Sequence, residues 1–337
     1  MDRIMLGHGS GGRLMHQLIK EHVAPAFGLK MLADSAVLGP DEFCGCRIAF
    51  TTDSYVVSPI FFPGGDIGGL SVNGTVNDLA MVGAKPLYIS AGFVIEEGFP
   101  MDSLRRVLVS MAGAAVKAGV RIVTGDTKVV DKGKGDGIFI NTSGIGAIRH
   151  GINLGARMVR PGDKVIISGT IGNHGVAVMS ERNGLSFDPP VLSDTAALGG
   201  LVEAMLGFEK DIRIMRDPTR GGVATTLKEI ASECGLPVIL NEESLPVPGG
   251  VRGACDILGL DPLYIANEGI LLAVVPPETA ESLAGVMRKH EHGSATAVIG
   301  VIGAADPGRK GMVLLRTAIG GTRIIDMLAG EQLPRIC

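Results

Sequence analysis

Glycine is the feature of this sequence that most restricts its fold. Fifty of the 337 residues are glycine, against an average usage of roughly 7%. The glycines show no three-residue period, which excludes a collagen-like chain, and they are interleaved with Val, Ile and Ala, which excludes a low-complexity segment. The pattern is typical of an α/β enzyme with many tight turns and close backbone approaches.

Composition excludes several classes of protein. The length suits about two domains of ~150 residues, and 46% hydrophobic content provides the apolar surface for two cores. The net charge of -4 and the absence of Trp argue against a nucleic-acid binder, which needs a basic surface and aromatic stacking platforms. The longest apolar run, Ile270 to Val275, is far shorter than the ~18 residues of a membrane span. We therefore expect a cytoplasmic protein with no membrane partner.

Strand-like and helix-like patterns alternate along the sequence, which indicates a mixed α/β fold. The helix 103–118 is well signalled, because Asp102 can cap it, an apolar stripe follows and Gly119 ends it. The expected helices are 14–23, 67–81, 103–118, 194–206, 223–234 and 278–289. The expected strands are 47–52, 87–95, 120–123, 138–148, 164–168, 238–240, 263–266, 270–275 and 297–302.

A turn at Arg160-Pro161-Gly162-Asp163 opens a second block, so we place the domain boundary between His150 and Pro161. The expected division is 1–155, 156–310 and a C-terminal segment 311–337. The last seven residues, 331–337, have no periodicity and include Pro334. We expect this tail to be mobile or to dock as an extended peptide.

Aspartates recur beside glycines and at the ends of expected strands. Asp53, Asp126 and Asp217 have such positions, and Asp34 and Asp78 complete the set. Magnesium takes one or two carboxylates together with water and substrate phosphates, so single aspartates that converge in space predict a nucleotide and Mg²⁺ site. The alternative for each aspartate is a turn or a helix cap.

The helix 67–81 contains three glycines, each of which costs up to ~1 kcal/mol relative to alanine. Asn73 and Asn77 share one face beside Asp78, and apolar residues supply the other. We interpret the glycines as points where a neighbour approaches closely, and the Asn/Asp edge as the border of a polar site. The alternative is tight helix packing with solvated amides.

Two glycine-rich stretches precede expected helices, where free N–H groups bind phosphate. One contains Gly9 and Gly11, and the other is Gly221-Gly222. A Walker A sequence is absent, and so is GxGxxG after a first strand. The stretch 169–175 is a weak substitute that reads better as a loop. Nucleotide binding must therefore follow another design.

Three further residues are candidates for chemistry. Lys128, two positions after Asp126, can neutralise phosphate charge, or is an exposed lysine at a strand end. Glu268 lies among apolar neighbours, where a carboxylate can act as a base. Cys337 is the last residue, so its own carboxylate should raise its thiol pKa, which Arg335 offsets in part. Such a thiol suits acylation by an activated donor, followed by movement into an active site. The other cysteines form no CxxC pair or zinc spacing.

At this point the chain resembles the HypE family of hydrogenase maturation proteins, in the superfamily of aminoimidazole ribonucleotide synthetase (PurM) and selenophosphate synthetase. The likeness runs nearly end to end, and the terminal Pro-Arg-Ile-Cys is its most specific part. It rests on residues 51–57, 61–68, 74–80, 125–130, 139–142, 217–222, 267–269 and 334–337.

The resemblance implies a PurM-like two-domain fold of mixed α/β (α+β) class, with a flexible C-terminal tail. Residues 1–155 would bind ATP and form a dimeric β-barrel, 156–310 would form the C-terminal α/β domain, and 311–337 would carry the acceptor Cys337. It implies Mg²⁺ on Asp53, Asp78, Asp126 and Asp217, and catalysis by Cys337, Glu268 and Lys128. The implied nucleotide-binding residues are Gly9, Gly11, Asp34, Thr52, Asp53, Asn77, Asp78, Asp126, Thr127, Asp217, Arg220, Gly221 and Gly222.

The implied activity is an ATP-dependent dehydration of a carbamoyl group on Cys337 to a thiocyanate, which supplies cyanide to the iron of [NiFe]-hydrogenase. The implied partners are a second copy of the chain, the carbamoyltransferase HypF, and the HypC and HypD scaffold. Two alternatives stay open at this stage. One is another ATP-dependent synthetase that acts on a free small molecule, and the other is a non-catalytic scaffold whose tail cysteine relays a metal.

Overall fold

The computed structural model describes residues 3–5, 18–28, 45–327 and 335–337. Gly9, Gly11 and Asp34, and residues 14–17 of the expected helix 14–23, lie outside these ranges. The helices are η2 (Ile19–Val23, a π-helix), α2 (Ala24–Ala26), α3 (Ile67–Met81), α4 (Met101–Ala118), α5 (Asn173–Asn183), α6 (Gly199–Met205), α7 (Gly222–Cys234), α8 (Gly249–Leu258) and α9 (Pro277–Met287). Short 3-10 turns are η4 (Ala156–Met158), η5 (Leu206–Phe208), η6 (Glu242–Ser244), η7 (Pro262–Tyr264), η8 (Glu291–Gly293) and η9 (Pro307–Arg309).

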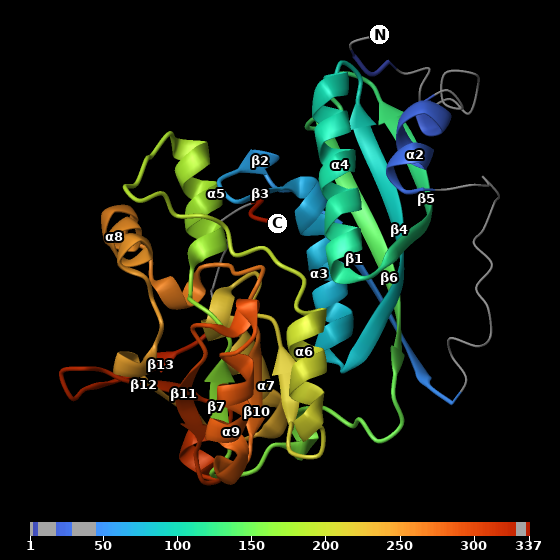
Figure 1. Cartoon of the computed structure of the whole chain (residues 1–337). Coiled ribbons are helices and arrows are strands. Elements are labelled where there is room, and N and C mark those ends of the chain that lie inside the picture. Colours follow the sequence, from blue (N-terminus) through green and yellow to red (C-terminus); the bar gives the residue numbers. More distant parts are fainter. Residues whose placement is uncertain (1–2, 6–17, 29–44, 328–334) are drawn as a thin grey trace.

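Two sheets organise the fold (Figure 1). The N-terminal sheet has the order β1 (Arg47–Tyr55), β6 (Ile138–Ile148), β4 (Ala84–Glu96), β5 (Arg121–Val130). The second has the order β13 (Thr322–Ile325), β12 (Val313–Arg316), β9 (Val238–Asn241), β11 (Ala297–Ile302), β7 (Lys164–Ile167), β10 (Leu272–Val275), β8 (Ile214–Arg216). A small hairpin pairs β2 (Phe61–Phe62) with β3 (Gly65–Asp66). The mixed α/β class that the sequence predicts is confirmed.

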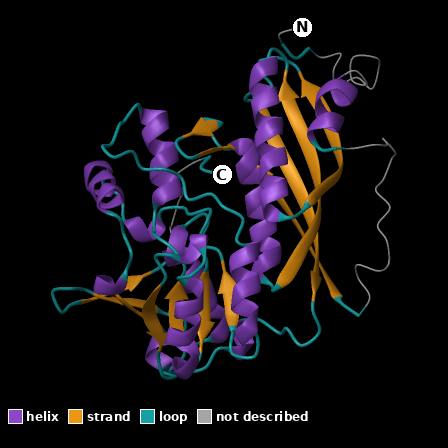
Figure 2. Ribbon diagram, viewed as in Figure 1, coloured by secondary structure: helices purple, strands orange, loops and turns teal. Residues whose placement is uncertain are grey.

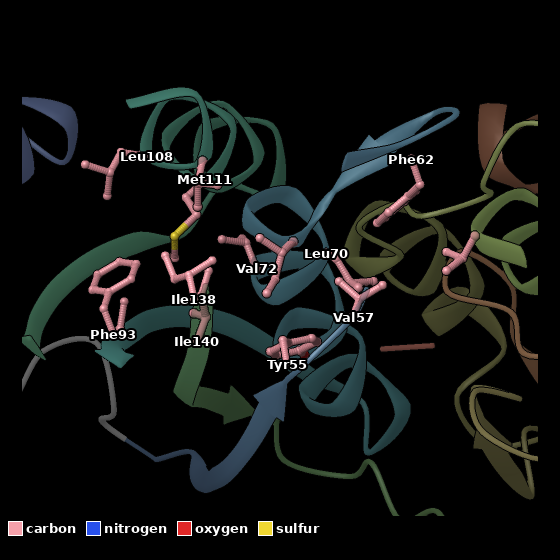
Figure 3. Close-up of a cluster of buried hydrophobic side chains, with 14 of the residues drawn as sticks. Tyr55, Val57, Phe62, Leu70, Val72, Phe93, Leu108, Met111, Ile138 and Ile140 are labelled. Carbon is pink, nitrogen blue, oxygen red and sulfur yellow. The ribbon is translucent and has the colours of Figure 1, made fainter. Parts of the chain in front are cut away.

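Helices α3 and α4 cover one face of the N-terminal sheet, which we call the inner face (Figure 2). Side chains alternate between the two faces, as a strand requires. Figure 3 shows Leu70 and Val72 of α3 packed with Met111 of α4 and with Ile138 and Ile140 of β6. The opposite face, the outer face, exposes Ile48, Phe50 and Val94 by 61, 69 and 39%.

The glycines of α3 allow this packing. A Cβ at Gly68 would lie 2.4 Å from the Val107 carbonyl of α4, and one at Gly74 would lie 2.2 Å from the Tyr55 hydroxyl. Asp66 caps the helix by accepting from the N–H groups of residues 68 and 69 at 2.7 and 3.0 Å. The predicted bounds of this helix are confirmed, and so is the interpretation of its glycines as points of close approach.

The central strands of the second sheet are buried on both faces, whereas its edge strand β13 is mostly exposed. All residues of β10 are buried, which its continuous apolar run predicts for a central strand. One face packs on α7, through residues such as Val165 and Val274. The other packs on α6 and α9, and this core also includes Leu79 and Met81 at the end of α3. The two domains therefore share an apolar core. The segment 311–337 supplies β12 and β13 to this sheet.

Several sequence predictions of local structure are wrong. The expected strand 263–266 is a 3-10 turn and a loop, because Asp261 caps the Leu263 N–H and Pro262 begins the turn. The expected helix 194–206 begins only at Gly199. Asp102 does not cap α4, which starts at Met101, and instead pairs with Arg105 at 2.8 Å. Helices α5 and α8 and strands β2, β3, β8, β12 and β13 are not among the elements predicted from the sequence, and a loop was predicted where α5 begins.

Candidate active site

The end of the chain lies against the segment that follows β1, in the space between the two domains (Figure 1). Val56 donates its backbone N–H to an oxygen of Cys337 at 3.1 Å, and Ser58 donates to the Arg335 carbonyl at 3.2 Å. This spacing is that of an antiparallel strand pair. The Ile336 side chain is only 2% exposed and packs in the N-terminal core. Of the expected tail 331–337 the structure describes residues 335–337, and these residues are docked on the protein.

Two arginines fasten the tail. Arg182 of α5 donates to the Arg335 carbonyl at 2.8 Å and to the Ser58 carbonyl at 2.9 Å. Arg335 donates from Nε to the Val56 carbonyl at 3.0 Å and pairs with Asp136. The tail is therefore held by side chains of both domains as well as by backbone hydrogen bonds.

Three predicted metal ligands come together near the docked tail. Asp53 lies on the inner face of β1, Asp78 lies near the end of α3, and Asp217 precedes the turn into α7. Burial raises the pKa of Asp78. A hydrogen bond from Thr51 lowers this pKa in part, and the charge of Asp53 raises it further. Burial and the charge of Asp78 raise the pKa of Asp217 to about 7. The charges of Asp53 and Asp78 thus disfavour ionisation of their acidic neighbours, an effect that a cation would offset.

Glu268 belongs to the same cluster and is almost completely buried. Its side chain is 3% exposed, and its Oε1 has no hydrogen-bond partner among the described residues. Burial raises the pKa of Glu268 well above its ordinary value, and the charges of Asp217 and Asp194 raise it further. Burial and these neighbouring carboxylates therefore both disfavour the charged form of Glu268.

Asp194 fixes the backbone beside Glu268. Its carboxylate accepts from the N–H of Glu268 at 3.2 Å and from that of Gly269 at 3.0 Å. Burial raises the pKa of Asp194 to about 6. A Cβ at Gly269 would lie 1.7 Å from the Asp194 carbonyl oxygen, so only glycine fits this position. These contacts replace the helix that the sequence predicts from residue 194.

The docked thiol of Cys337 lies in this acidic environment. Burial raises its pKa, the charge of Glu268 raises it further, and Arg220 lowers it in part. The sequence analysis predicted a raised thiol pKa from the terminal carboxylate, whereas burial is the larger cause here. These couplings place the sulfur within electrostatic reach of Glu268, Arg220 and Asp53.

Asn77, a predicted nucleotide-binding residue, joins the two domains. Its Nδ2 donates to the carbonyls of Ala196 at 3.0 Å and Glu268 at 3.2 Å, and its Oδ1 accepts from the Leu198 N–H at 2.8 Å. It is 1% exposed. Asn73 donates to Thr195 at 3.2 Å. The alternative of solvated amides on α3 is wrong, because both amides are buried and bonded.

The segment Arg220-Gly221-Gly222 forms the turn into α7. Both glycines have positive φ, 77° and 61°, and a Cβ at Gly222 would lie 2.5 Å from the Leu263 carbonyl. The turn therefore brings the start of α7, next to Asp217, up against the segment that leads to Glu268. Arg220 is exposed at this end of the helix.

Asp126 and Lys128 lie elsewhere. They flank Thr127, which is 5% exposed and pairs with Phe93 in the inner core, so both project from the outer face of β5. Lys128 Nζ lies 3.1 Å from Asp126 Oδ2, and the two side chains are 61 and 63% exposed. Thr52 also lies on the outer face, where it accepts from Ser143 at 2.9 Å. A single chain therefore does not bring Asp126 and Lys128 to the inner acidic cluster.

The sequence analysis missed three residues that build this region: His174, Arg182 and Asp194. His174 lies within the glycine-rich stretch 169–175, and a histidine beside glycines was the available signal. Arg182 and Asp194 carried none, because their partners are distant backbone groups. The sequence expectation also placed Asp53 and Asp126 after strands, whereas β1 and β5 continue past them.

Within the described ranges, no group of three or more His, Cys, Asp or Glu side chains is arranged to hold a metal ion. Across the same residues, no helix has the length and apolarity to cross a bilayer.

Comparison with known proteins identifies the family. Models of the AIR synthase related protein match residues 33–148 (N-terminal domain) and 160–310 (C-terminal domain). The carbamoyl dehydratase HypE of Cupriavidus necator is 52% identical over 338 aligned residues, which cover 99% of this chain and 95% of that protein. The chain belongs to the HypE family.

Solved structures of HypE proteins share the fold. One in complex with ATP has a TM-score of 0.91 at 48% identity, with 99% of each chain covered. A HypE–HypF complex contains a chain with a TM-score of 0.80 at 48% identity, with 92% of this chain and 99% of that chain covered. The two-domain fold implied by the resemblance is thereby confirmed, whereas the dimeric barrel involves a second chain and stays a prediction.

Proposed function

We propose that this HypE chain is an ATP-dependent carbamoyl dehydratase, which converts a carbamoyl group on the Cys337 sulfur into a thiocyanate and so supplies the cyanide ligand of the [NiFe]-hydrogenase iron. The observation that carries the proposal is the docked chain end, where Cys337 accepts from the Val56 N–H at 3.1 Å and the charges of Glu268, Arg220 and Asp53 act on the thiol pKa. The names of the relatives and the ATP complex of a similar structure support it.

Dehydration of a primary amide requires its oxygen to leave, and hydroxide leaves badly. The amide oxygen on the Cys337 carbamoyl group attacks the γ-phosphorus of ATP, the bond from that phosphorus to the bridging oxygen breaks, and ADP departs. The nitrogen then loses its two protons, the carbon–oxygen bond breaks with phosphate as the leaving group, and a carbon–nitrogen triple bond remains. The products are thiocyanate, ADP and phosphate.

The acidic cluster fits Mg²⁺, and we assign Asp53, Asp78 and Asp217 as its ligands from this chain. Crowded carboxyl groups with raised pKa values and the unpartnered Glu268 Oε1 are what a divalent cation would relieve. Magnesium takes few protein carboxylates when phosphate oxygens and water complete its shell, which agrees with the lack of a preformed cage among the described residues. When bound, the ion neutralises phosphoryl charge and favours the ionised form of Glu268.

Glu268 is our candidate base for the nitrogen protons. It lies close enough to Cys337 for its charge to raise the thiol pKa. Burial raises its pKa, which strengthens the ionised carboxylate as a proton acceptor, and a cation in the cluster would favour that ionised form. Arg220 and the start of α7 at Gly221-Gly222 are positioned to bind phosphate groups.

The outer face supports a homodimer and a composite site. It exposes Ile48 and Phe50 on β1 at one edge of the sheet, and Asp126 and Lys128 on β5 at the other edge. A second copy that covers this face would place Asp126 and Lys128 at the site of the other chain. Mg²⁺ contact by Asp126 and charge stabilisation by Lys128 then act across the dimer.

The docked, partly buried thiol also bears on the partners. Because Cys337 is held between the domains, the tail must leave this position to receive a carbamoyl group. We propose HypF as the donor, which the HypE–HypF complex of a similar protein supports. The HypC and HypD scaffold, as the acceptor of the cyano group in the cytoplasm, follows from the family resemblance.

Intact protein carbamoylated on Cys337 with cyanate, and then incubated with Mg-ATP, tests the proposal. Cleavage after Glu331 releases a C-terminal peptide of six residues, whose mass should fall by one water. Cys234→Ser serves as a control that keeps the reaction, and Cys337→Ser as one that abolishes it. A scaffold would lose no water. A synthetase for a free small molecule would keep its ATP turnover after deletion of Ile336 and Cys337.

A further inference from the structure

His174 of α5 is fully buried at the point where the tail meets both domains. Its Nε2 lies 2.8 Å from the Ile336 carbonyl oxygen, and its Nδ1 lies 2.8 Å from the Ser193 hydroxyl oxygen. Phe62 packs edge-on against the ring, with 5.3 Å between centroids. Both ring nitrogens are therefore used, one by the tail and one by the body of the protein.

The tail defines the tautomer of this ring. A carbonyl oxygen only accepts, so Nε2 must carry the hydrogen, and Nδ1 then accepts from the Ser193 hydroxyl. Burial lowers the pKa of His174 to about 4, against an opposing effect of the Ile336 hydrogen bond. The ring is thus neutral at physiological pH and holds a single hydrogen-bonding arrangement.

The hydrogen bonds continue from His174 to the helix that carries Asp78. The Ser193 hydroxyl oxygen accepts from the Thr195 N–H at 3.1 Å. The Thr195 hydroxyl oxygen accepts from Asn73 of α3 at 3.2 Å. The chain His174–Ser193–Thr195–Asn73 therefore connects the tail to α3, which also carries Asp78 of the acidic cluster.

We propose that His174 is a positioning residue for the dehydration step, which clamps the Ile336 carbonyl and so holds the Cys337 sulfur and its carbamoyl group at one place in the acidic cluster. The inference rests on the proposed function. His174 acts through the tail, one residue away from the sulfur. An amide oxygen that must attack phosphorus reacts fastest when its approach is fixed in advance, because less conformational freedom is lost on reaching the transition state.

The clamp divides the two half-reactions. Carbamoyl transfer from a donor needs the tail outside the cleft, where the Ile336 carbonyl has no contact with His174. Dehydration needs the docked tail. Loss of the clamp should therefore slow dehydration and leave both ATP affinity and loading of Cys337 unchanged.

The variants are chosen to separate the donor from the bulk of the ring. His174→Leu fills the space without a donor, and His174→Gln keeps a side-chain N–H. Ser180→Ala is the matched control, because it removes one buried hydroxyl that bonds only within α5, to the Ala177 carbonyl at 2.9 Å. Ser193→Ala keeps the ring and frees its tautomer, and it carries the test if His174→Leu does not fold.

Docking is measured without catalysis, from the alkylation rate of Cys337 by iodoacetamide in nucleotide-free protein, followed on the C-terminal peptide. Loss of one hydrogen bond should raise this rate about tenfold in His174→Leu and about threefold in Ser193→Ala. His174→Gln and Ser180→Ala should stay close to the wild type. This readout does not require the protein to be a dehydratase.

Positioning is measured in a single turnover of cyanate-loaded protein with Mg-ATP. The rate of water loss should fall about tenfold in His174→Leu with an unchanged Kd for ATP, and His174→Gln should restore it. Unchanged alkylation in both His174→Leu and Ser193→Ala, or faster alkylation with an unchanged dehydration rate, overturns the clamp. An equal effect of Ser180→Ala does so as well, since it indicates general loosening. If wild-type protein loses no water at all, the proposed function fails, and the alkylation result then judges docking by itself.

Discussion

The side-chain amide of Asn77 donates to the backbone carbonyl of Glu268 at 3.2 Å. Helix α3, which carries Asp78, therefore also fixes the position of the loop that carries Glu268, the candidate base. Asn77 makes two further bonds to residues 196 and 198. The resemblance implied a nucleotide contact for this residue. The geometry assigns it to the junction between the domains.

Asn77→Leu should destabilise the protein by roughly 2–4 kcal/mol, because buried backbone donors and acceptors lose their partner. Urea unfolding measures the change. Asn183→Leu is the control, since Asn183 is exposed and bonds only to the Met179 carbonyl of its own helix. Equal stability of the two variants would contradict the structural role.

Gly269→Ala should abolish dehydration and lower the free energy of unfolding by about 3 kcal/mol or more, because the added Cβ would meet the Asp194 carbonyl at 1.7 Å. Gly253→Ala in α8 meets nothing within 4 Å and should stabilise the protein by up to ~1 kcal/mol. Thermal unfolding and single-turnover assays compare the two. A Gly269→Ala variant that keeps wild-type activity would show that the loop has another conformation.

Asp217→Asn should stabilise the nucleotide-free protein at pH 8. The raised pKa of about 7 means that the folded state retains a proton that the unfolded state has lost, so the carboxyl group costs stability as pH rises from about 4 through 7. Asp217 is partly exposed, so we expect about 1–2 kcal/mol rather than the full linkage energy. The same variant should lose the rise in Tm on addition of Mg-ATP. No gain at pH 8 relative to pH 5 would refute the crowding.

Lys128→Ala and Cys337→Ser chains should complement one another when mixed as heterodimers. In such a dimer the Lys128→Ala chain supplies Cys337, and the Cys337→Ser chain supplies the Lys128 that acts on it. Recovery of water loss on the first chain, in single-turnover mass measurements, is the result expected from the outer-face position of Lys128. Inactive heterodimers would instead place Lys128 at the site of its own chain.

His174→Gln should remove part of the acid sensitivity of the fold. With a pKa of about 4 against 6.5 when unfolded, His174 stabilises the neutral-pH protein, and this contribution is lost as pH falls from about 6.5 toward 4. The difference corresponds to roughly 3 kcal/mol. Asp194, whose raised pKa acts in the opposite direction, is present in both proteins, so it cancels in the comparison. Unfolding by urea at pH 7 and pH 4.5 measures the difference, and parallel losses in both proteins would rule it out.

The sequence pattern predicts those helices and strands whose bounds depend on residues close to them in sequence. The helix 67–81 and the strand 297–302 are recovered with their observed bounds, since periodicity and flanking glycines define them. The buried setting of Glu268 is recovered from its apolar neighbours. The helix expected from residue 194 fails because the Asp194 carboxylate bonds to a loop more than 70 positions away.

The separation of Asp126 and Lys128 from the acidic cluster could be predicted in part from the sequence. Thr127 lies between them, so the alternation of side chains along a strand puts both on one face. The strand was expected to end at Val123, however, so this alternation was not applied to residues 126 and 128. The role of His174 could not be predicted from the sequence, because it depends on a contact with Ile336, which lies 162 positions away.

The apolar core that Leu79 and Met81 share with α6 has a mechanical result. Separation of the two domains would expose this core to water, so we expect substrate access to depend on movement of the tail rather than on separation of the domains.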